Sequence, residues 1–186
     1  MPAPATDFDR AVADLKSLQV RPEVALSEAP APRRMAPEAL ALTAEIVADD
    51  IELGHGRLVV LHNPDGEDAW EGATRLVLYI DAAVEREMAA DPMLPEVGWT
   101  WLEESLDSAE AHSWALGGTV TRVQSEPYGA MTERGPEGRL QIRASWTADL
   151  DRLAEQVQAW TDLLATACGL EPLPDGVALL TPRSAS

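Results

Sequence analysis

Near the end of the chain, apolar and polar residues alternate with a period of two. The apolar members of the pattern are Leu140, Ile142, Ala144 and Trp146, and the polar ones between them are Gln141, Arg143 and Ser145. Such alternation is typical of a strand with one buried face. In the next segment the apolar spacing changes to three or four, as on one face of a helix: Leu150, Leu153, Val157, Trp160, Leu164 and Ala167. We expect this strand and this helix to bury their apolar faces against each other.

Similar patterns predict the other elements. We expect a first helix over residues 7–18 with Asp7 as its N-cap, and strands over residues 40–47, 57–62 and 75–80. A helical region begins at about residue 84, is broken at Asp91-Pro92 and Pro95, and resumes at Trp99. A strand that follows Trp114 forms a hairpin with the strand at 140–146. The Ala and Glu content of 40–47 also allows a helix there, and Gly54 and Gly56 mark the turn between the first two strands.

Short connections between the strands favour antiparallel pairing. We therefore predict an α+β fold, a two-layer sandwich with helices on one face of a five-stranded, mainly antiparallel sheet in the order α-β-β-β-α-β-β-α. This order resembles the type III secretion chaperone-like fold, a dimer-forming scaffold that binds other proteins. Residues 1–186 form a single domain in this interpretation. It contains a proline-rich connecting segment at 22–37, which we expect to be ordered, and a loose C-terminal tail at 181–186.

The formal net charge of −18 argues against nucleic acid and anionic membranes as partners, because binding to either depends on positive charge. No apolar run approaches the roughly 18 residues that a membrane span needs. The N-terminal MPAPATDFDR lacks the basic and apolar parts of a signal peptide. Cys168 is the single cysteine, so we expect a small buried hydrophobic residue without a disulfide partner. These features predict a cytoplasmic protein.

Longer segments carry a more specific signal: RPEV at Arg21, PAPRRMAP at Pro30, GRLVVLHNPDGEDAWEG at Gly56, DPMLPEVGWTWL at Asp91, GTVTRVQS at Gly118, IRASWT at Ile142 and LEPLPDGV at Leu170. Together they resemble an uncharacterised actinobacterial family that is catalogued as domain of unknown function family 3000. The resemblance runs from Phe8 to Val177. It implies a cytoplasmic actinobacterial protein and supplies no reaction, cofactor or catalytic residue.

Residues that could support catalysis or metal binding form no established motif. His62 has carboxylates nearby in the sequence, but a zinc site needs three or four convergent ligands, usually with close spacing. We therefore predict no metal and no cofactor. A nucleophile elbow is absent, and Gly117-Gly118 lacks the rest of a phosphate loop, which favours a bulge or turn within the strand. These observations leave enzymatic activity uncertain and weigh against it.

Strand alternation places polar residues on the face away from the helices. If the apolar residues of the strand at 75–80 face the helices, then Arg75 and Tyr79 face away from them. Arg143 does the same in the last strand, and Arg122 can join from the strand before. Arginine pairs bidentately with carboxylates, so this face suits an acidic partner. The alternative is a solvated face whose arginines pair with neighbouring acids.

Tryptophan supplies most of the aromatic residues. Three tryptophans lie on the predicted apolar faces and are expected in the core: Trp99, Trp146 and Trp160. Three lie outside a clean apolar stripe and either line a groove or anchor loops: Trp70, Trp101 and Trp114.

Two functional hypotheses follow. The first is a non-enzymatic protein-binding or adaptor protein that uses the Arg-bearing sheet face or the Trp-lined loops, with a homodimer as an open possibility. The second is an enzyme that acts on a small anionic substrate with His62 or His112 and the arginines. A convergent pocket with histidine and carboxylates would favour the enzyme. A shallow face with arginine and tyrosine would favour the binding protein.

Overall fold

An antiparallel sheet with helices on one side makes up the computed structural model, which describes residues 4–173. Within these residues the strands are β1 (Val24–Ala29), β2 (Glu38–Ala48), β3 (Ile51–Glu67), β4 (Gly72–Val84), β5 (Ser113–Ser125) and β6 (Glu137–Ala148). Their order in the sheet is β1-β2-β3-β4-β6-β5, and every neighbouring pair is antiparallel. The predicted α+β class and antiparallel pairing are confirmed, but the sheet has six strands instead of five.

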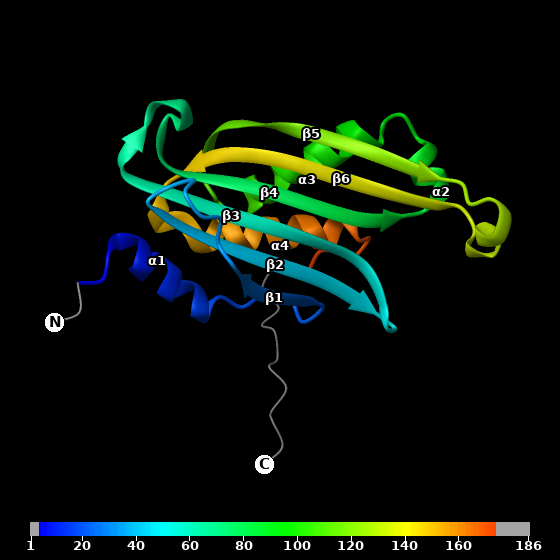
Figure 1. Ribbon diagram of the computed structural model, residues 1–186, viewed down its shortest axis with the longest axis horizontal. Coiled ribbons are helices and arrows are strands. Elements are labelled where there is room, and N and C mark those ends of the chain that lie inside the picture. Colours follow the sequence, from blue (N-terminus) through cyan, green and yellow to red (C-terminus); the bar gives the residue numbers. More distant parts are fainter. Residues whose placement is uncertain (1–3, 174–186) are drawn as a thin grey trace, which may run out of the picture.

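The helices of the described chain are α1 (Asp7–Asp14), α2 (Arg86–Ala90), α3 (Leu94–Ser108) and α4 (Leu153–Ala167). Short 3-10 turns supplement them: η1 (Leu15–Ser17), η2 (Asp68–Trp70), η3 (Gly129–Arg134) and η4 (Leu150–Arg152). Figure 1 shows α3 and α4 behind the strands, whereas no α-helix crosses the face toward the viewer. No helix within residues 4–173 combines the length and the apolar character that crossing a membrane requires. The tail predicted at 181–186 lies outside the described residues.

The additional strand, β1, lies inside the segment 22–37 that was predicted to be a connection. Its six residues fit between Pro22 and Pro30, and it pairs with β2 alone. Prolines are tolerated around an edge strand because only one side of that strand must supply hydrogen bonds to the sheet. The rest of the segment is held to the sheet by Arg57, whose Nη2 donates to the Pro30 carbonyl oxygen (3.1 Å). The segment therefore contains a short strand despite its proline-rich composition.

Gly54 and Gly56 do not form the turn that was predicted for them, because both lie within β3. The turn is made by Asp49–Asp50, whose φ angles are 51° and 60°. A Cβ at Gly56 would lie 2.8 Å from the Tyr79 carbonyl oxygen and 3.0 Å from Trp160 Nε1. Glycine is needed there because the Trp160 ring fills the space that a side chain would occupy.

The core lies between the sheet and α4, as the two apolar patterns predicted. Trp146 of β6 and Trp160 of α4 are both 0% exposed. Trp146 Nε1 donates to Gln156 Oε1 (2.7 Å), and Gln156 in turn donates to the Ala111 carbonyl oxygen. The buried indole therefore keeps a hydrogen-bond partner, which avoids the cost of an unpaired polar group. Trp99, also predicted in the core, is half-buried against it.

The ends of two helices differ from the prediction. Thr6, and not Asp7, caps α1: its hydroxyl accepts from the Asp9 N–H (3.0 Å), and its own N–H donates to the Asp9 carboxylate (2.9 Å). This reciprocal arrangement is a capping box. Helix α3 begins at Leu94, so Pro95 lies in its first turn and does not interrupt it. Proline is suited to the first turn because its missing N–H has no helical partner there.

Candidate functional site

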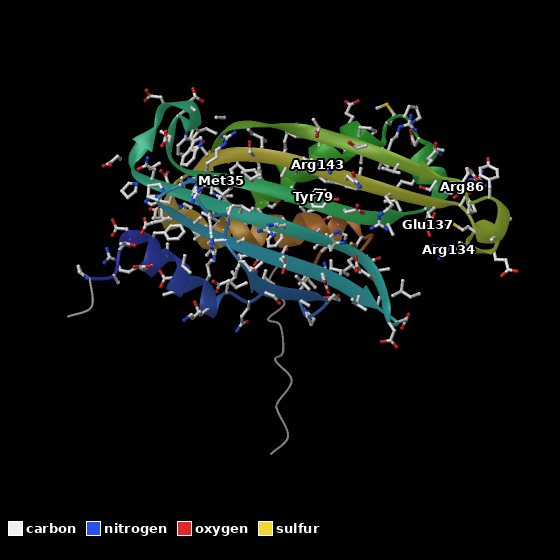
Figure 2. The ribbon with its side chains drawn as sticks, viewed as in Figure 1. Met35, Tyr79, Arg86, Arg134, Glu137 and Arg143 are labelled. Carbon is white, nitrogen blue, oxygen red and sulfur yellow. The ribbon has the colours of Figure 1, made fainter. Side chains whose placement is uncertain are left out.

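The helix-free face of the sheet brings a tyrosine and two arginines together on adjacent strands. Tyr79 on β4 lies opposite Arg143 on β6 and opposite Arg57 on β3. The guanidinium carbon of Arg143 is 4.9 Å from the centroid of the Tyr79 ring, which is a cation–π distance. Figure 2 shows Tyr79 and Arg143 next to each other near the middle of this face. The structure places both on the face where strand alternation predicted them, and it adds Arg57.

A groove of about 640 Å³ lies along these side chains toward β5. Its lining includes Val77, Gly117–Gly118 and Thr119 besides the arginines and the tyrosine, and it contains no carboxylate. Val77 is 39% exposed although β4 is a central strand of the sheet. The groove therefore combines an apolar floor with two positive side chains, in a chain whose net charge is −18.

Gly117 and Gly118 give the groove its β5 side. A bulge or turn was predicted at Gly117-Gly118; the pairing of β5 with β6 does shift register, but between Trp114 and Gly117, and both glycines are paired with β6. A Cβ on Gly118 would lie 2.7 Å from the Ala144 Cα and closer still to the Arg143 carbonyl oxygen, whereas a Cβ on Gly117 would meet no atom within 4 Å. The backbone of β5 therefore approaches β6 more closely than a residue with a side chain would allow.

Asp81 accepts hydrogen bonds from several polar side chains beside the groove. It is 6% exposed, and its carboxylate accepts from Gln141 Nε2 (2.8 Å), from the Tyr79 hydroxyl (3.1 Å) and from Arg139 Nε. Burial alone would raise the pKa of Asp81, but the bonds from Gln141 and Arg139 outweigh it and hold that pKa below its ordinary value. Burial raises the pKa of Tyr79, and the Asp81 charge adds to this effect. Tyr79 is therefore a neutral hydrogen-bond donor near neutral pH.

The substitution Asp81→Asn should lower stability in a pH-dependent way. A carboxyl group whose folded pKa is depressed stabilises the fold above its unfolded pKa of about 3.9 and loses this contribution as pH falls through the folded value. We expect the variant to be about 2 kcal/mol less stable than the parent at pH 7, and this difference to shrink at about pH 3 and below. Urea unfolding at both pH values measures it, with the exposed Glu137→Gln as the control for loss of one charge. A difference that does not change with pH would contradict this role of the carboxylate.

Arg75 lies on the same face, but its guanidinium donates hydrogen bonds to other groups of the protein. Its Nη1 donates to the Ala115 carbonyl oxygen (3.0 Å) and to Thr147 Oγ1 (2.9 Å), and its Nη2 donates to Ser145 Oγ (2.7 Å). Burial lowers the pKa of Arg75, and the charge of Glu71 partly offsets this shift. Arg75 therefore ties the bulged end of β5 to the sheet and offers little charge to a ligand.

The three tryptophans outside the predicted stripes do not share a groove. Trp114 Nε1 donates to the Glu71 carbonyl oxygen (3.0 Å), and the Trp70 carbonyl oxygen accepts from Thr147 Oγ1. Both residues thus anchor the connection between β3 and β4. Trp101 belongs to α3 in the helical layer, where it is half-buried against the core.

Arg122 lies on the helix-covered side of the sheet, so its predicted place on the open face is wrong. It pairs with the core residue Leu140, and its Nη1 donates to the carbonyl oxygens of Ala89–Ala90 at the end of α2 (3.1 and 3.0 Å). The alternation of β5 is ambiguous because its two half-buried valines, Val120 and Val123, are three residues apart and point to opposite faces. Arg122 therefore caps a helix instead of serving the open face.

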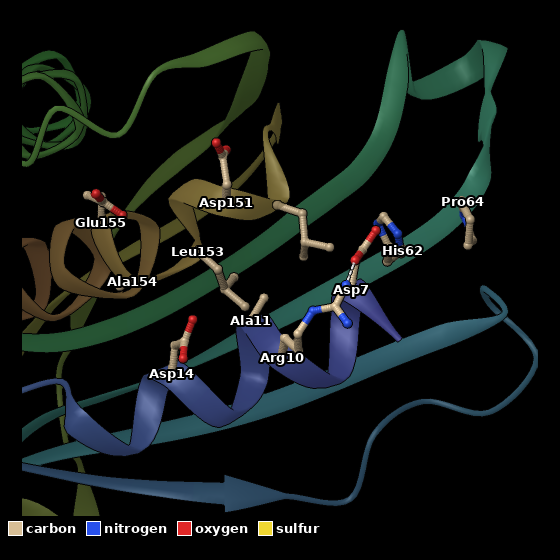
Figure 3. A pocket seen from close by; sticks show the side chains of 11 residues that line it. Asp7, Arg10, Ala11, Asp14, His62, Pro64, Asp151, Leu153, Ala154 and Glu155 are labelled. Carbon is tan, nitrogen blue, oxygen red and sulfur yellow. Dashed lines mark hydrogen bonds and ion pairs between the residues drawn. The ribbon is translucent and has the colours of Figure 1, made fainter. Parts of the chain in front are cut away.

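His62 occupies a cavity of about 680 Å³ that involves α1, β3 and the start of α4 (Figure 3). Its Nδ1 is 2.8 Å from Thr74 Oγ1, and its ring stacks on Phe8 with a centroid distance of 5.7 Å. Its Nε2 is 3.9 Å from Glu38 Oε2, which has no hydrogen-bond partner among the described residues. The imidazole is therefore held in place from two sides beneath α1.

The charge in this cavity does not suit a small anionic substrate. Four carboxylates line it: Asp7, Asp14, Asp151 and Glu155. Arg10 is the one arginine in the lining, and it pairs with Asp7. His112 lies elsewhere, exposed in the turn between α3 and β5 with a φ of 48°. His62 and His112 thus do not converge on one pocket with the arginines of the sheet face. His55, the third histidine, lies on that face beside Tyr79, with a ring centroid distance of 6.2 Å, and its Nδ1 is 2.6 Å from Glu52 Oε1.

Metal-binding and thiol chemistry find little support in the described part of the chain. Within residues 4–173, no three side chains of the His, Cys, Asp and Glu types gather closely enough to hold a metal ion. Cys168 is half-buried, and burial raises the pKa of its thiol to about 11. A thiol with this pKa is protonated near neutral pH and is a poor nucleophile.

Sequence reasoning missed Arg57 and Asp81 as residues of the site. Asp81 could have been found from alternation, because it lies two residues after Tyr79, which was assigned to the open face. Arg57 was the first residue of the strand predicted at 57–62, and the faces of that strand were not assigned. Asp81 lay one residue beyond a predicted strand end, although β4 continues to Val84.

No curated protein and no solved structure matches the chain. A family model described as "Protein of unknown function (DUF3000)" matches residues 4–178. This range contains every element of the fold and the whole groove. The chain therefore belongs to the DUF3000 family.

Proposed function

We propose that this chain is a non-enzymatic binding protein whose groove on the helix-free sheet face holds an acidic segment of a protein partner. The observation that carries the proposal is the groove itself, in which Arg143 and Arg57 border the exposed Val77 without a carboxylate in the lining. A bound segment would cover the exposed Val77 side chain and remove it from water. Two arginines beside that area favour carboxylates as the groups to be bound.

The two arginines are positioned before a partner arrives. The Arg143 guanidinium lies over the Tyr79 ring, and its one side-chain hydrogen bond within the described residues, to Gln141 Oε1, is long at 3.5 Å. Arg57 donates one N–H to Pro30. Each guanidinium therefore keeps donors for a carboxylate while its orientation is restricted, which reduces the entropy lost on binding.

The separation of His62 from the arginines of the open face, among the described residues, supports binding over catalysis. The His62 cavity is acidic, and the arginines of the open face lie on the other side of the sheet from it. We keep a cytoplasmic location as part of the proposal. We also keep the analogy to type III secretion chaperones, which bind other proteins with an α+β scaffold, although β1 is an addition to the predicted order.

The proposal predicts that Arg143→Glu weakens partner capture about tenfold or more, because it replaces an attraction by a repulsion inside the groove. Arg134→Glu is the matched control: it makes the same change in net charge at an exposed residue of η3, far from the groove in Figure 2. Immobilised parent and variants are exposed to an extract of the source cells, and captured proteins are quantified by mass spectrometry. Circular dichroism confirms that each variant is folded.

The salt dependence of capture provides a second readout. At 0.15 M salt, charges more than about 8 Å apart are already screened, so further salt acts on close pairs. Raising the salt to about 0.5 M should therefore release the partner from the parent protein. Equal capture by the parent and Arg143→Glu would remove the groove as the binding site.

A further inference from the structure

One edge of the sheet is a long strand without a described neighbour. β5 has 13 residues and pairs with β6 along one side. Within the described chain, no backbone group of residues 116–125 is hydrogen bonded to any segment other than β6. An edge of this length offers a row of unpaired N–H and C=O groups to another strand.

β5 lacks most of the residue types that usually protect such an edge. From Ser113 to Ser125 the strand has no proline, no lysine and no acidic residue, in a chain with 32 acids. Its one charge, Arg122, is turned toward the helical layer and bound to the end of α2. The other edge differs, because β1 is six residues long, carries Glu28 and is flanked by prolines. Natural sheets use such devices to prevent edge pairing. In β5 they are limited to Arg122 and to the register shift between Trp114 and Gly117, and residues 117–125 pair with β6 without a further shift.

Exposed apolar side chains accompany this edge in the helical layer. Helices α2 and α3 pack against β5, and Figure 1 shows them behind the β5 side of the sheet. Met88 on α2, Met93 before α3 and Val97 on α3 are 41%, 53% and 38% exposed. A partner strand on β5 would bring a second helical layer next to these residues, so the contact would extend beyond backbone hydrogen bonds.

We propose that β5 pairs with β5 of a second copy of this chain, in an antiparallel arrangement around a two-fold axis perpendicular to the sheet. Each strand then supplies to the other the same donors and acceptors that it receives, which is the isologous contact of a symmetric dimer. The acid-free composition of β5 allows two strongly negative chains to approach there. Charges farther than about 8 Å from the contact are screened at physiological salt.

This dimer would place both helix-free faces on the same side of one continuous sheet. Thr119 and Gly117–Gly118 line the groove next to β5, so the grooves of the two copies would lie on either side of the two-fold axis. The dimer rests on the edge alone and does not depend on the ligand proposed for the groove.

The test uses the full chain and a pair of complementary variants. Sedimentation equilibrium of the parent at tens of micromolar should give twice the chain mass of 20.0 kDa. Thr119 and Thr121 are exposed on one side of β5. Thr119→Glu with Thr121→Glu, and Thr119→Lys with Thr121→Lys, should each raise the dimer Kd by about tenfold or more, because like charges meet across the axis. An equimolar mixture of the two variants should recover the dimer, since opposite charges then meet.

The β1 edge supplies the matched control. Ala25→Glu with Ser27→Glu places the same charges on exposed positions of the opposite edge and should leave the dimer intact. Circular dichroism establishes that all variants are folded. A monomeric parent would overturn the proposal and leave the β5 edge to a strand of a different protein. A dimer that survives both β5 variants, or that is lost in the β1 variant, would overturn it as well.

Discussion

Replacing Gly118 by alanine is expected to lower the free energy of unfolding by about 3 kcal/mol, at the upper end of what overpacking usually costs. The added Cβ would lie 2.7 Å from the Ala144 Cα, and both close neighbours are backbone atoms of β6 that cannot move aside alone. The two strands must separate locally, which breaks ladder hydrogen bonds. In a chain of this length, the melting temperature should fall by about 6–12 °C.

Gly117 is the matched control for this substitution. A Cβ there meets no atom within 4 Å, so Gly117→Ala should change stability by less than about 0.5 kcal/mol. Thermal unfolding of the two variants beside the parent measures the contrast. Similar melting temperatures for both variants would show that β5 does not approach β6 in the way that the bulge requires.

The second large effect is expected at Trp160. Trp160→Ala removes a completely buried indole that packs over Gly56, so it should cost about 3–5 kcal/mol. Trp160→Phe should cost less than about 1.5 kcal/mol. It keeps an aromatic ring and removes the Nε1–H, which has no hydrogen-bond partner among the described residues.

Urea unfolding of the two Trp160 variants gives both values on one scale. The order of the variants is the informative result, because it separates the volume of the ring from its polar atom. If the phenylalanine variant were as unstable as the alanine variant, then the indole N–H would have a partner, and the packing of α4 on β3 would need a different explanation.

The parts of the fold that could be predicted are those where the period of the apolar residues is strong. The alternation at 140–146 and the helical stripe at 150–167 correspond to β6 and α4, and they bury each other. A sheet strand and an adjacent helix with complementary apolar faces leave few other ways to exclude water. This part of the prediction depended only on which residues are buried, and the spacing of apolar residues indicates burial directly.

The predictions were wrong where a residue type is compatible with two different local structures. Glycine marks a turn in most sequences, but Gly54 and Gly56 are small because Cys168 and Trp160 fill the adjacent space. Proline discourages strands, but β1 is an edge strand that fits between two prolines. For the two glycines the deciding contacts come from residues far along the chain, and for β1 the deciding factor is its place at the edge of the sheet beside β2. No local pattern contains this information.

The candidate site, too, could be predicted only in part from the sequence. Alternation was enough to place Tyr79 and Arg143 on the open face, because β4 and β6 have clear periods. It could not show that the guanidinium of Arg75 already donates to Ala115, Thr147 and Ser145. Nor could it show that Asp81 accepts hydrogen bonds from Arg139 and Gln141. Which arginine is free for a ligand depends on side-chain contacts between strands, and these follow from the register.

The central claim, that a partner occupies the helix-free face, is tested most directly by photo-cross-linking. A benzoylphenylalanine is placed at Val77 in the groove and, in a matched protein, at Glu104, which is exposed on α3 in the other layer. Irradiation in an extract of the source cells should give a discrete adduct of higher mass from the Val77 protein and none from the Glu104 protein. An adduct from the Glu104 protein alone would contradict the proposed site.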